Sequence, residues 1–355
     1  MHKNYAAWNI DLYQVIREEK NEEKLFSLFL HAGSLAPSTH NAQPWEFAIS
    51  DHCIQLYSSP ERLLPQTDPT GKLLAISMGT CIEAIVLAGG VAGYDVLVTL
   101  GAHTQPGDLF ATLTFTKNEA GQTTFTPLLV ALPSRRTNRF PYTEAPVDEQ
   151  LIADMKQQAE HQNVTLLTFV ETPDKEAIAN VLLDSREALF DDPHFREEMA
   201  TYKRSNMTRA YTGMPGFTMG FSFLASLLSP FIIRRFNVIK PIRAKEFTLL
   251  TTQTPLLCFI ATKNNAQEDW CNAGRAYLHI ALFAEAAGYA TAISAAPREK
   301  GPLSRAMHTE LTAQLSLRVG IATQSAGHSP RLPLAQLMRA KECTINSDGE
   351  RRDNI

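Results

Sequence analysis

The chain has 355 residues, of which 44% are hydrophobic and 20% are charged, so it can bury one large core or two medium ones. Lys and Arg number 33 and Asp and Glu number 37, a formal charge of −4 without a long single-sign run. These values exclude general disorder and argue against nucleic acid or an acidic membrane as a partner. The 5 cysteines show no C-x-x-C pair and no histidine at zinc-ligand spacing, which argues against a disulfide scaffold and against a metal site; they are Cys53, Cys81, Cys258, Cys271 and Cys343.

Two segments provide information on the cellular location of the protein and on a possible membrane contact. Residues 1–20 contain acidic side chains and no apolar core of the signal-peptide type, which predicts a protein kept in a reducing cytoplasm. Residues 216–233 form a membrane-like stretch, but Gly220, three serines and Pro230 interrupt it, so a membrane contact is the least favoured interpretation. An apolar lid packed on its own domain and an interface to another chain are the other two interpretations.

Hydrophobic periodicity predicts a helix over 22–35, ended by Gly33 and Pro37. A hairpin of strands at 45–49 and 53–57 follows, and then a buried helix over 73–93 that is apolar almost all round. The remaining predicted elements are strands at 95–99, 109–116 and 123–126, a helix over 147–158, a strand at 164–170, a helix near 269–289, a strand at 291–294 and a last strand from 315.

The later elements repeat the earlier ones. Residues 79–94 align without a gap with residues 274–289 at a constant offset of 195. The identical pairs are Gly79/Gly274, Ile85/Ile280, Leu87/Leu282, Ala92/Ala287, Gly93/Gly288 and Tyr94/Tyr289. Chance similarity between two buried helices is the alternative. The repeat predicts two related α+β halves, 1–130 and 131–355, with an apolar lid-like insertion in the second at about 186–250.

Two short segments have a composition that suits ligand binding. Residues 36–45, with the sequence APSTHNAQPW, end a helix and present two hydroxyls, two amides and an imidazole before a strand. Amides both donate and accept hydrogen bonds, as the edge of a heterocycle requires, although a Pro-capped Ser/Asn turn would look the same. Residues 134–139, with the sequence SRRTNR, carry three guanidinium groups that match phosphate oxygens, although a solvated basic loop is the alternative.

Residues 36–45 resemble the A-P-S-x-x-N-x-Q-P-W signature of the nitroreductase family of flavin enzymes. Residues 135–139 resemble that family's R-x-S/T-x-R phosphate motif. The helix at 269–289 and the segment 315–331 are similar to the family's central helix, last strand and late basic residue. The resemblance covers most of 22–337, is weakest over 186–252, and implies an α+β nitroreductase-like fold.

Family members are usually homodimers that bind FMN between subunits, with the phosphate arginines from one subunit and the turn from the other. Here the first half has the turn, but residues 6–11 read AAWNID where its arginine motif should stand. The second half has the arginines but enters a strand at 164 without the turn. The chain therefore resembles the Acg-like subfamily, in which a tandem repeat forms a pseudo-dimer with one FMN site, and a further homodimer is left open.

The resemblance implies a role for each motif residue. The FMN phosphate would be held by Arg135, Arg136, Thr137 and Arg139, helped by Arg331. The flavin ring would be lined by Pro37, Ser38, Thr39, Asn41 and Gln43. No catalytic side chain is implied because the flavin performs the chemistry, and His40 is either a proton donor or a structural imidazole.

The implied function is NAD(P)H-linked two-electron reduction of an electron-poor small molecule such as a nitro compound or a quinone. The alternative is a protein that stores or sequesters FMN with little turnover. A third hypothesis, a protein-interaction module, would use the apolar stretch 216–233.

Overall fold

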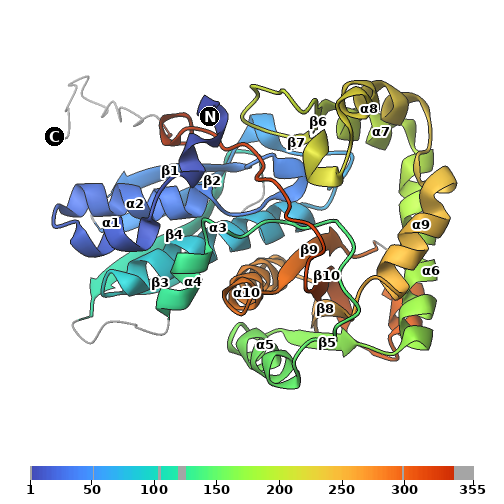
Figure 1. The fold of residues 1–355 in the computed structure, drawn as a ribbon. Coiled ribbons are helices and arrows are strands. Elements are labelled where there is room, and N and C mark those ends of the chain that lie inside the picture. The colour runs from blue at the N-terminus through green and yellow to red at the C-terminus, as the bar shows by residue number, and fades with distance from the viewer. Residues whose placement is uncertain (1, 51, 103–104, 119–124, 298–299, 340–355) are drawn as a thin grey trace.

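The computed structural model describes residues 2–50, 52–102, 105–118, 125–297 and 300–339. These residues form two four-stranded antiparallel sheets whose long helices, α3 (Lys72–Val91) and α10 (Gln267–Ala286), lie side by side at the centre of the molecule (Figure 1). The predicted α+β class is confirmed.

The first half follows the predicted order closely. Its helices are α1 (Leu12–Glu18) and α2 (Glu22–Ser34), and its strands are β1 (Trp45–Ser50), β2 (Cys53–Ser58), β3 (Tyr94–Leu100) and β4 (Leu109–Lys117). Asn21 begins α2 by accepting a hydrogen bond from the Lys24 amide, and the predicted hairpin is confirmed by the β1–β2 pairing. The predicted strand at 123–126 is wrong at its described end, where Thr126 starts α4 (Thr126–Ala131) with Pro127 in its first turn; residues 123 and 124 lie outside the described residues.

The second half repeats this arrangement. It contains α5 (Glu149–His161), β5 (Thr165–Phe169), β8 (Leu256–Thr262), β9 (Ala290–Ala295), α11 (Lys300–Ala306) and β10 (Thr312–Gly320). The two sheets have the orders β1-β2-β4-β3 and β5-β8-β10-β9, so within each the first strand pairs with the second, the second with the fourth and the fourth with the third. A long helix follows the second strand in both, which supports the predicted repeat.

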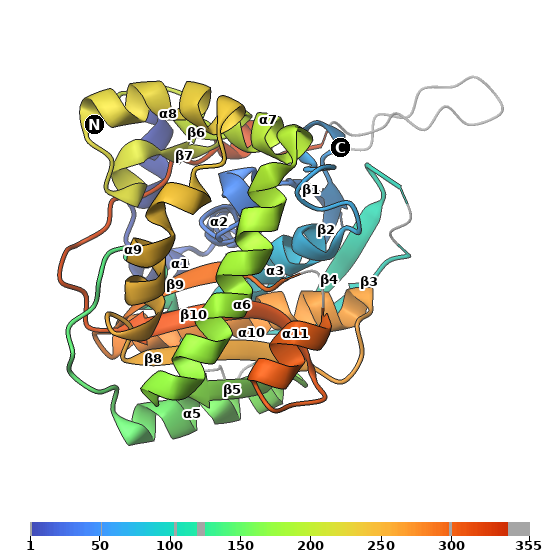
Figure 2. The same cartoon turned by 90° about the vertical axis from the view of Figure 1, so that its right-hand side faces the viewer.

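An insertion separates β5 from β8, where the first half has only a tight hairpin. It comprises α6 (Thr172–Asp191), α7 (Pro193–Thr201), β6 (Lys203–Arg204), β7 (Met214–Pro215), the short η5 (Gly216–Met219), α8 (Phe223–Arg235) and α9 (Ile239–Thr251). The insertion starts with α6 at Thr172, earlier than the expected residue 186. Figure 2 shows α6 running along one side of the molecule toward α7 and α8.

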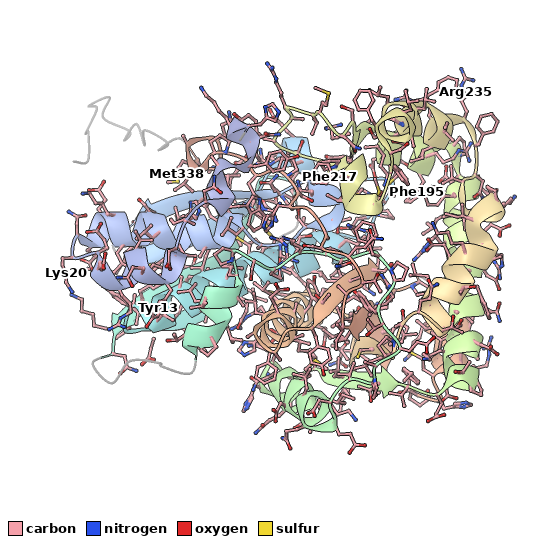
Figure 3. All side chains as sticks on the ribbon, viewed as in Figure 1. Tyr13, Lys20, Phe195, Phe217, Arg235 and Met338 are labelled. Atoms are coloured by element: carbon pink, nitrogen blue, oxygen red, sulfur yellow. The ribbon has the colours of Figure 1, made fainter. Side chains whose placement is uncertain are left out.

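The apolar stretch 216–233 is divided between η5 and α8, and its lid-like role stays a prediction. Most of it lies in α8, where Ser226, Ser229 and Ile233 face inward. Large apolar side chains of α8 face outward, among them Leu224 at 69% exposure, and Arg235 stands at the outer edge of the molecule (Figure 3). The Ser226 and Ser229 hydroxyls can face inward because they donate to helix carbonyls. The apolar face of α8 is left exposed by the residues that the structure describes.

The central helix α3 is long and apolar enough to span a membrane, but 89% of its most apolar window is buried within the molecule, as in the core helix of a globular domain. Its one buried carboxylate, Glu83, accepts hydrogen bonds from Arg275 at 3.0 Å and bonds the His279 ring at 2.9 Å on α10. Cys271 is 1% exposed on the same helix. Both His279 and Cys271 therefore belong to the core.

The C-terminal part of the described chain returns to the first half. The amide of Phe47 on β1 donates to the Leu337 carbonyl, and the amide of Arg339 donates to Phe47. Leu332 and Leu337 are buried in the core of the first half. This return brings residues 327–331 beside the turn that follows α2.

Candidate functional site

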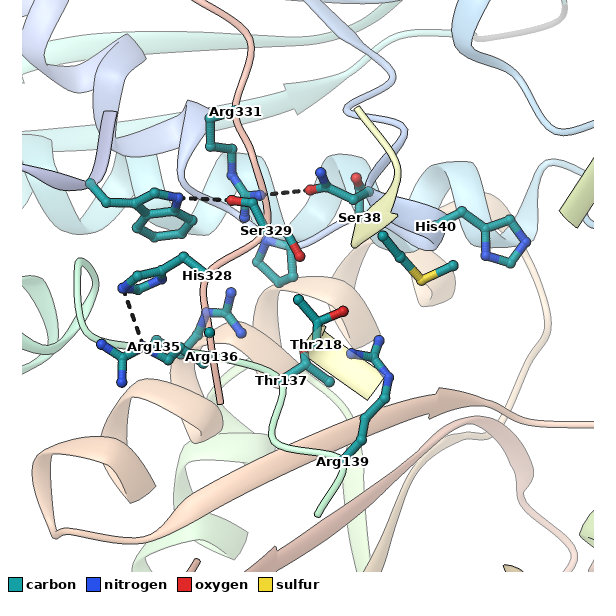
Figure 4. Close-up of a pocket in the computed structure, with 15 residues that line it drawn as sticks. Ser38, His40, Arg135, Arg136, Thr137, Arg139, Thr218, His328, Ser329 and Arg331 are labelled. Atoms are coloured by element: carbon teal, nitrogen blue, oxygen red, sulfur yellow. Dashed lines mark hydrogen bonds between the residues drawn. The ribbon is translucent and has the colours of Figure 1, made fainter. Parts of the chain in front are cut away.

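A pocket forms where five segments meet: the N-terminal 3-10 helix that ends at Trp8, the turn after α2, the loop after α4, the segment after β10 and the insertion (Figure 4). Eight of the ten predicted site residues line it, namely Pro37, Ser38, Asn41, Arg135, Arg136, Thr137, Arg139 and Arg331. The two sequence motifs, about 100 residues apart in the chain, therefore contribute to one site.

Thr39 and Gln43 do not line this pocket. Thr39 faces a neighbouring cavity, and Gln43 is fully buried. The Gln43 amide donates to the Tyr211 carbonyl at 2.8 Å and accepts from the Leu332 amide at 2.8 Å. Because its donor and acceptor are both occupied, Gln43 joins the first half to the insertion and to the C-terminal segment, a role that its polarity alone did not reveal.

The turn itself has an unusual backbone. His40, Asn41 and Gln43 have φ values of 53°, 56° and 54°, in the left-handed region that few non-glycine residues adopt. Two reciprocal bonds to the insertion support it: the Asn41 side chain donates to the Gly213 carbonyl at 3.1 Å, and the Gly213 amide donates to the Asn41 carbonyl at 3.2 Å. The insertion thus helps to hold the turn in its strained form.

Most of the N–H groups of Arg331 already form hydrogen bonds within the protein. One terminal nitrogen donates to the Leu35 and Ala36 carbonyls at the end of α2, and the other donates to Asn41 Oδ1 at 2.6 Å. The guanidinium also lies 4.6 Å from the centre of the Trp8 ring, and only its Nε lacks a partner. The predicted free phosphate-binding fork is therefore reduced to one available N–H.

Arg135, unlike Arg331, has few hydrogen bonds to the protein. It is 3% exposed, yet its Nε and one Nη have no hydrogen-bond partner. Buried guanidinium nitrogens without partners are costly, and no Asp or Glu is among the described residues that line the pocket. The nearby Glu285 lies outside it, where burial raises the pKa of its carboxyl. The donor set therefore suits an anion with several oxygen acceptors, as a phosphate provides.

Trp8 and His328 were not predicted as site residues. Their rings stack with centroids 4.2 Å apart, and the Trp8 indole donates to the Ser329 carbonyl. Arg136 Nε donates to His328 Nε2 at 3.2 Å, so in the neutral ring the proton is on Nδ1, which has no partner. Burial, with the positive charge of Arg136, lowers the pKa of His328 to about 3, which keeps the ring neutral and leaves Nδ1–H as a donor.

The insertion forms the opposite wall with Met214 and Thr218. Lys203 pairs with Met214 between β6 and β7, and its Nζ donates to the Met219 sulfur at 3.0 Å. Burial and the Arg139 charge lower the pKa of Lys203 to about 7. Burial and the positive charges of Lys203 and Arg139 lower the pKa of His40 to about 3. The imidazole is therefore neutral near neutral pH, and its protonated form is scarce. This weakens the hypothesis that His40 donates a proton.

No protein-family model matches the chain. The chain is 31% identical over 164 residues, 46% of each sequence, to the "Putative NAD(P)H nitroreductase Rv3131" of Mycobacterium tuberculosis, so the match spans about half of that relative. It is 26% identical over 322 residues, 86% of this chain and 90% of the relative, to the uncharacterized protein Rv3127 of that organism. A match to its Acg protein, named in the same way, spans 111 residues at 28% identity, 31% of this chain and 34% of Acg.

Among solved structures, the chain is similar to the FMN-dependent nitroreductase NfnB of Mycobacterium smegmatis in complex with NADPH. The TM-score is 0.41 at 15% identity, over 59% of this chain and 96% of that one. The sequence relatives confirm the resemblance that the motifs indicated: the chain is similar to proteins named as nitroreductases, Acg included.

Proposed function

We propose that the chain is an FMN-binding oxidoreductase of the nitroreductase type. The observation that carries the proposal is the buried Arg135 guanidinium, two of whose nitrogens lack partners in a pocket lined by arginines and by no carboxylate among the described residues. Two of the sequence relatives carry the name "Putative NAD(P)H nitroreductase", which supports the same assignment.

The residues present fit the phosphate of FMN. Arg135, Arg136, Thr137, Arg139 and the free Nδ1–H of His328 would hold it, and Pro37, Ser38 and Asn41 would line the site beyond it. When bound, FMN supplies the redox chemistry by passing two electrons from NAD(P)H to an electron-poor acceptor such as a nitro compound or a quinone. The protein binds and orients the cofactor and excludes water.

The proposal includes one FMN per chain, within a tandem repeat that acts as a pseudo-dimer. Both halves contribute to the same pocket, since residues 37–41 come from the first and residues 135–139 lead into the second. The counterpart of the turn in the second half is a short connection at 162–164 between α5 and β5. We extend the proposal to a cytoplasmic location.

FMN storage is the second candidate function, and one observation favours it. Residues 203–218, named here the cover segment, are fastened across the site by the Asn41–Gly213 bonds, by Gln43 and by Asn4. A fastened cover would slow the access of a nicotinamide to the flavin.

A visible spectrum of the purified protein, followed by anaerobic addition of NADH and then NADPH, separates the candidates. Rapid bleaching of the flavin band supports the reductase. A flavin that dithionite reduces and neither nicotinamide does supports storage. Absence of flavin after incubation with FMN contradicts both, and two FMN per chain contradicts the single site.

A further inference from the structure

The outward face of α8 is apolar along the whole helix. Six large side chains follow one another there at helical spacing, and each is between 39% and 69% exposed: Phe223, Leu224, Leu227, Leu228, Phe231 and Ile232. The buried residues of the helix, two serines among them, lie on the opposite face. An apolar stripe that faces solvent reverses the usual arrangement of a surface helix, so it indicates a face that meets a partner.

No other part of this chain is suited to cover that face. The exposures show that no element of the described residues lies over it. Outside the described ranges the chain has only three large apolar residues, Met1, Ile345 and Ile355. These are too few to bury the stripe, so its partner comes from outside the chain.

The segment around this face is basic, although the protein as a whole is acidic. Residues 203–245, which include β6, β7, α8 and the first part of α9, contain eight of the 33 Lys and Arg and none of the 37 Asp and Glu. The overall charge of −4, which argued against an acidic membrane, conceals this separation of charge. The partner of the apolar face therefore meets a positive rim.

Two arginines of this segment are exposed at the end of the molecule where α8 lies. Arg235 ends α8 and stands at the outer edge (Figure 3), and Arg209 lies in the loop between β6 and β7. Figures 1 and 2 both show this loop and α8 at the same end of the molecule. Asn206 joins them, because its amide donates to Ser226 Oγ and its side chain donates to the Phe221 carbonyl, both at 3.0 Å.

These two guanidinium groups are available to a partner. Neither forms an ion pair or a hydrogen bond with its side chain among the described residues. Arg234, by contrast, is paired with Glu197 on α7. A free arginine beside an exposed apolar stripe suits a partner that offers anions next to an apolar phase.

An acidic lipid surface fits this combination better than a second copy of the chain. Two copies of the face would bring arginines together without any carboxylate from residues 203–245, and like charges at an interface cost affinity. Lipid phosphates pair with arginines, and apolar side chains of a surface-lying helix enter the boundary of the acyl chains. With 13 residues, α8 is shorter than the ~20 needed to span a bilayer, so it would lie on the surface.

We propose that the protein docks on an acidic lipid surface through the outward face of α8, with Arg209 and Arg235 at the lipid head groups. The inference goes beyond the proposed function and does not depend on the flavin. It assigns a role to the insertion, which supplies the apolar stripe and both arginines.

The test is flotation of the full-length protein with lipid vesicles. One set contains phosphatidylcholine alone, and the other contains equal parts of phosphatidylcholine and phosphatidylglycerol. We expect about 10- to 30-fold stronger binding to the acidic vesicles, as two cations near the surface predict, and weaker binding as salt is added. Arg235→Gln should weaken binding to the acidic vesicles about 5-fold and leave binding to the neutral ones unchanged.

Leu228→Asp tests the apolar stripe and should weaken binding to the acidic vesicles about 10-fold or more. Leu97→Asp is the matched control, because Leu97 is 66% exposed on β3, outside this face, and it should stay within about 2-fold of the wild type. Circular dichroism melts verify that each variant is folded.

Three results would overturn the proposal: no binding of the wild type to acidic vesicles, equal binding to both kinds of vesicle, or undiminished binding of Leu228→Asp. Sedimentation without lipid tests the other occupant. A dimer that Leu228→Asp converts to a monomer would assign the face to a second copy and would also overturn the proposal. Flavin content does not enter these measurements, so their failure leaves the proposed function standing.

Discussion

Gly79 and Gly274, which are equivalent positions of the repeat, each lie against the backbone of the opposite central helix. A Cβ at Gly79 would overlap the Cys271 carbonyl oxygen, and a Cβ at Gly274 would overlap the Ile76 carbonyl oxygen. Ile76 and Cys271 are themselves separated by the repeat offset of 195, so the contact is reciprocal. The two central helices therefore cross with their backbones in close contact at the paired glycines.

Gly79→Ala should therefore destabilise the protein by about 2–3 kcal/mol, because a carbonyl oxygen cannot rotate away and the helices must separate. Gly274→Ala should cost a similar amount, and the double variant less than the sum, since the first substitution already separates the helices. Urea denaturation midpoints measure these changes. Gly301→Ala, in α11, is the control and should be neutral or stabilising, because a Cβ there would meet only the Arg305 side chain, at 3.4 Å. Equal midpoints for Gly79→Ala and Gly301→Ala would contradict the close crossing.

Local patterns predicted the core elements and failed in the insertion. The helix over 22–35 and the hairpin after it were predictable because periodicity and turn residues there agree with tertiary packing. The helices α6 to α9 were not predicted, and the apolar stretch 216–233 was left with three interpretations: a lid, an interface to another chain and a membrane contact. Hydropathy indicates that a face is apolar but not whether another element covers it, and no element of the described residues covers the outward apolar face of α8.

Arg135→Met should weaken FMN binding about 10- to 100-fold and at the same time stabilise the flavin-free protein. The loss follows from removing charge-assisted bonds, each worth about 1.5–3 kcal/mol. The gain follows from replacing a buried, unpaired charge by an apolar side chain of similar length. Fluorescence titration with FMN and thermal melts without it measure the two effects. Arg305→Met, at an exposed site on α11, should change neither, and unaltered FMN affinity in Arg135→Met would remove Arg135 from the site.

The sequence predicted most of the residues that line the site but not the hydrogen bonds that hold them there. Eight of the ten residues line the pocket because the motifs carry the right donors. The sequence could not show that the Gln43 amide forms hydrogen bonds with Tyr211 and Leu332, since these partners lie more than 150 residues away in the chain. Trp8 and His328, which also line the pocket, were missed because nothing near them in the chain indicates a ligand.

Stability should fall as the pH falls from about 6.5 toward 3, in part because of His40. The folded protein lowers the pKa of His40 from 6.5 to about 3 through burial and the facing charges of Lys203 and Arg139, with Thr67 as its hydrogen-bond partner. Below about pH 6.5 the unfolded chain binds a proton that the folded chain does not, so protons favour unfolding in this window.

His40→Asn isolates this contribution, because Asn also tolerates the left-handed backbone at this position. The variant should lose less stability than the wild type between about pH 6.5 and pH 4, as measured by denaturant midpoints at several pH values. Parallel pH profiles for the two proteins would show that His40 is not the group that titrates. His194→Asn on α7, in an exposed position, is the control and should follow the wild type.

Asn4→Ala should loosen the cover segment without touching the pocket. The Asn4 side chain is 2% exposed and donates to the Thr208 and Ala210 carbonyls at 3.2 Å and 3.0 Å, so the substitution removes two bonds that fasten residues 203–218. At about 1 kcal/mol a bond, the open form gains about 5- to 30-fold in population, and the FMN dissociation rate and the rate of flavin bleaching by NAD(P)H should rise accordingly. Stopped-flow absorbance measures both rates.

Asn180→Ala, which removes an exposed amide bond to Glu176 within α6, is the control and should match the wild type. If Asn4→Ala also matches it, the cover segment does not limit access to the flavin, and the structural case for FMN storage is lost.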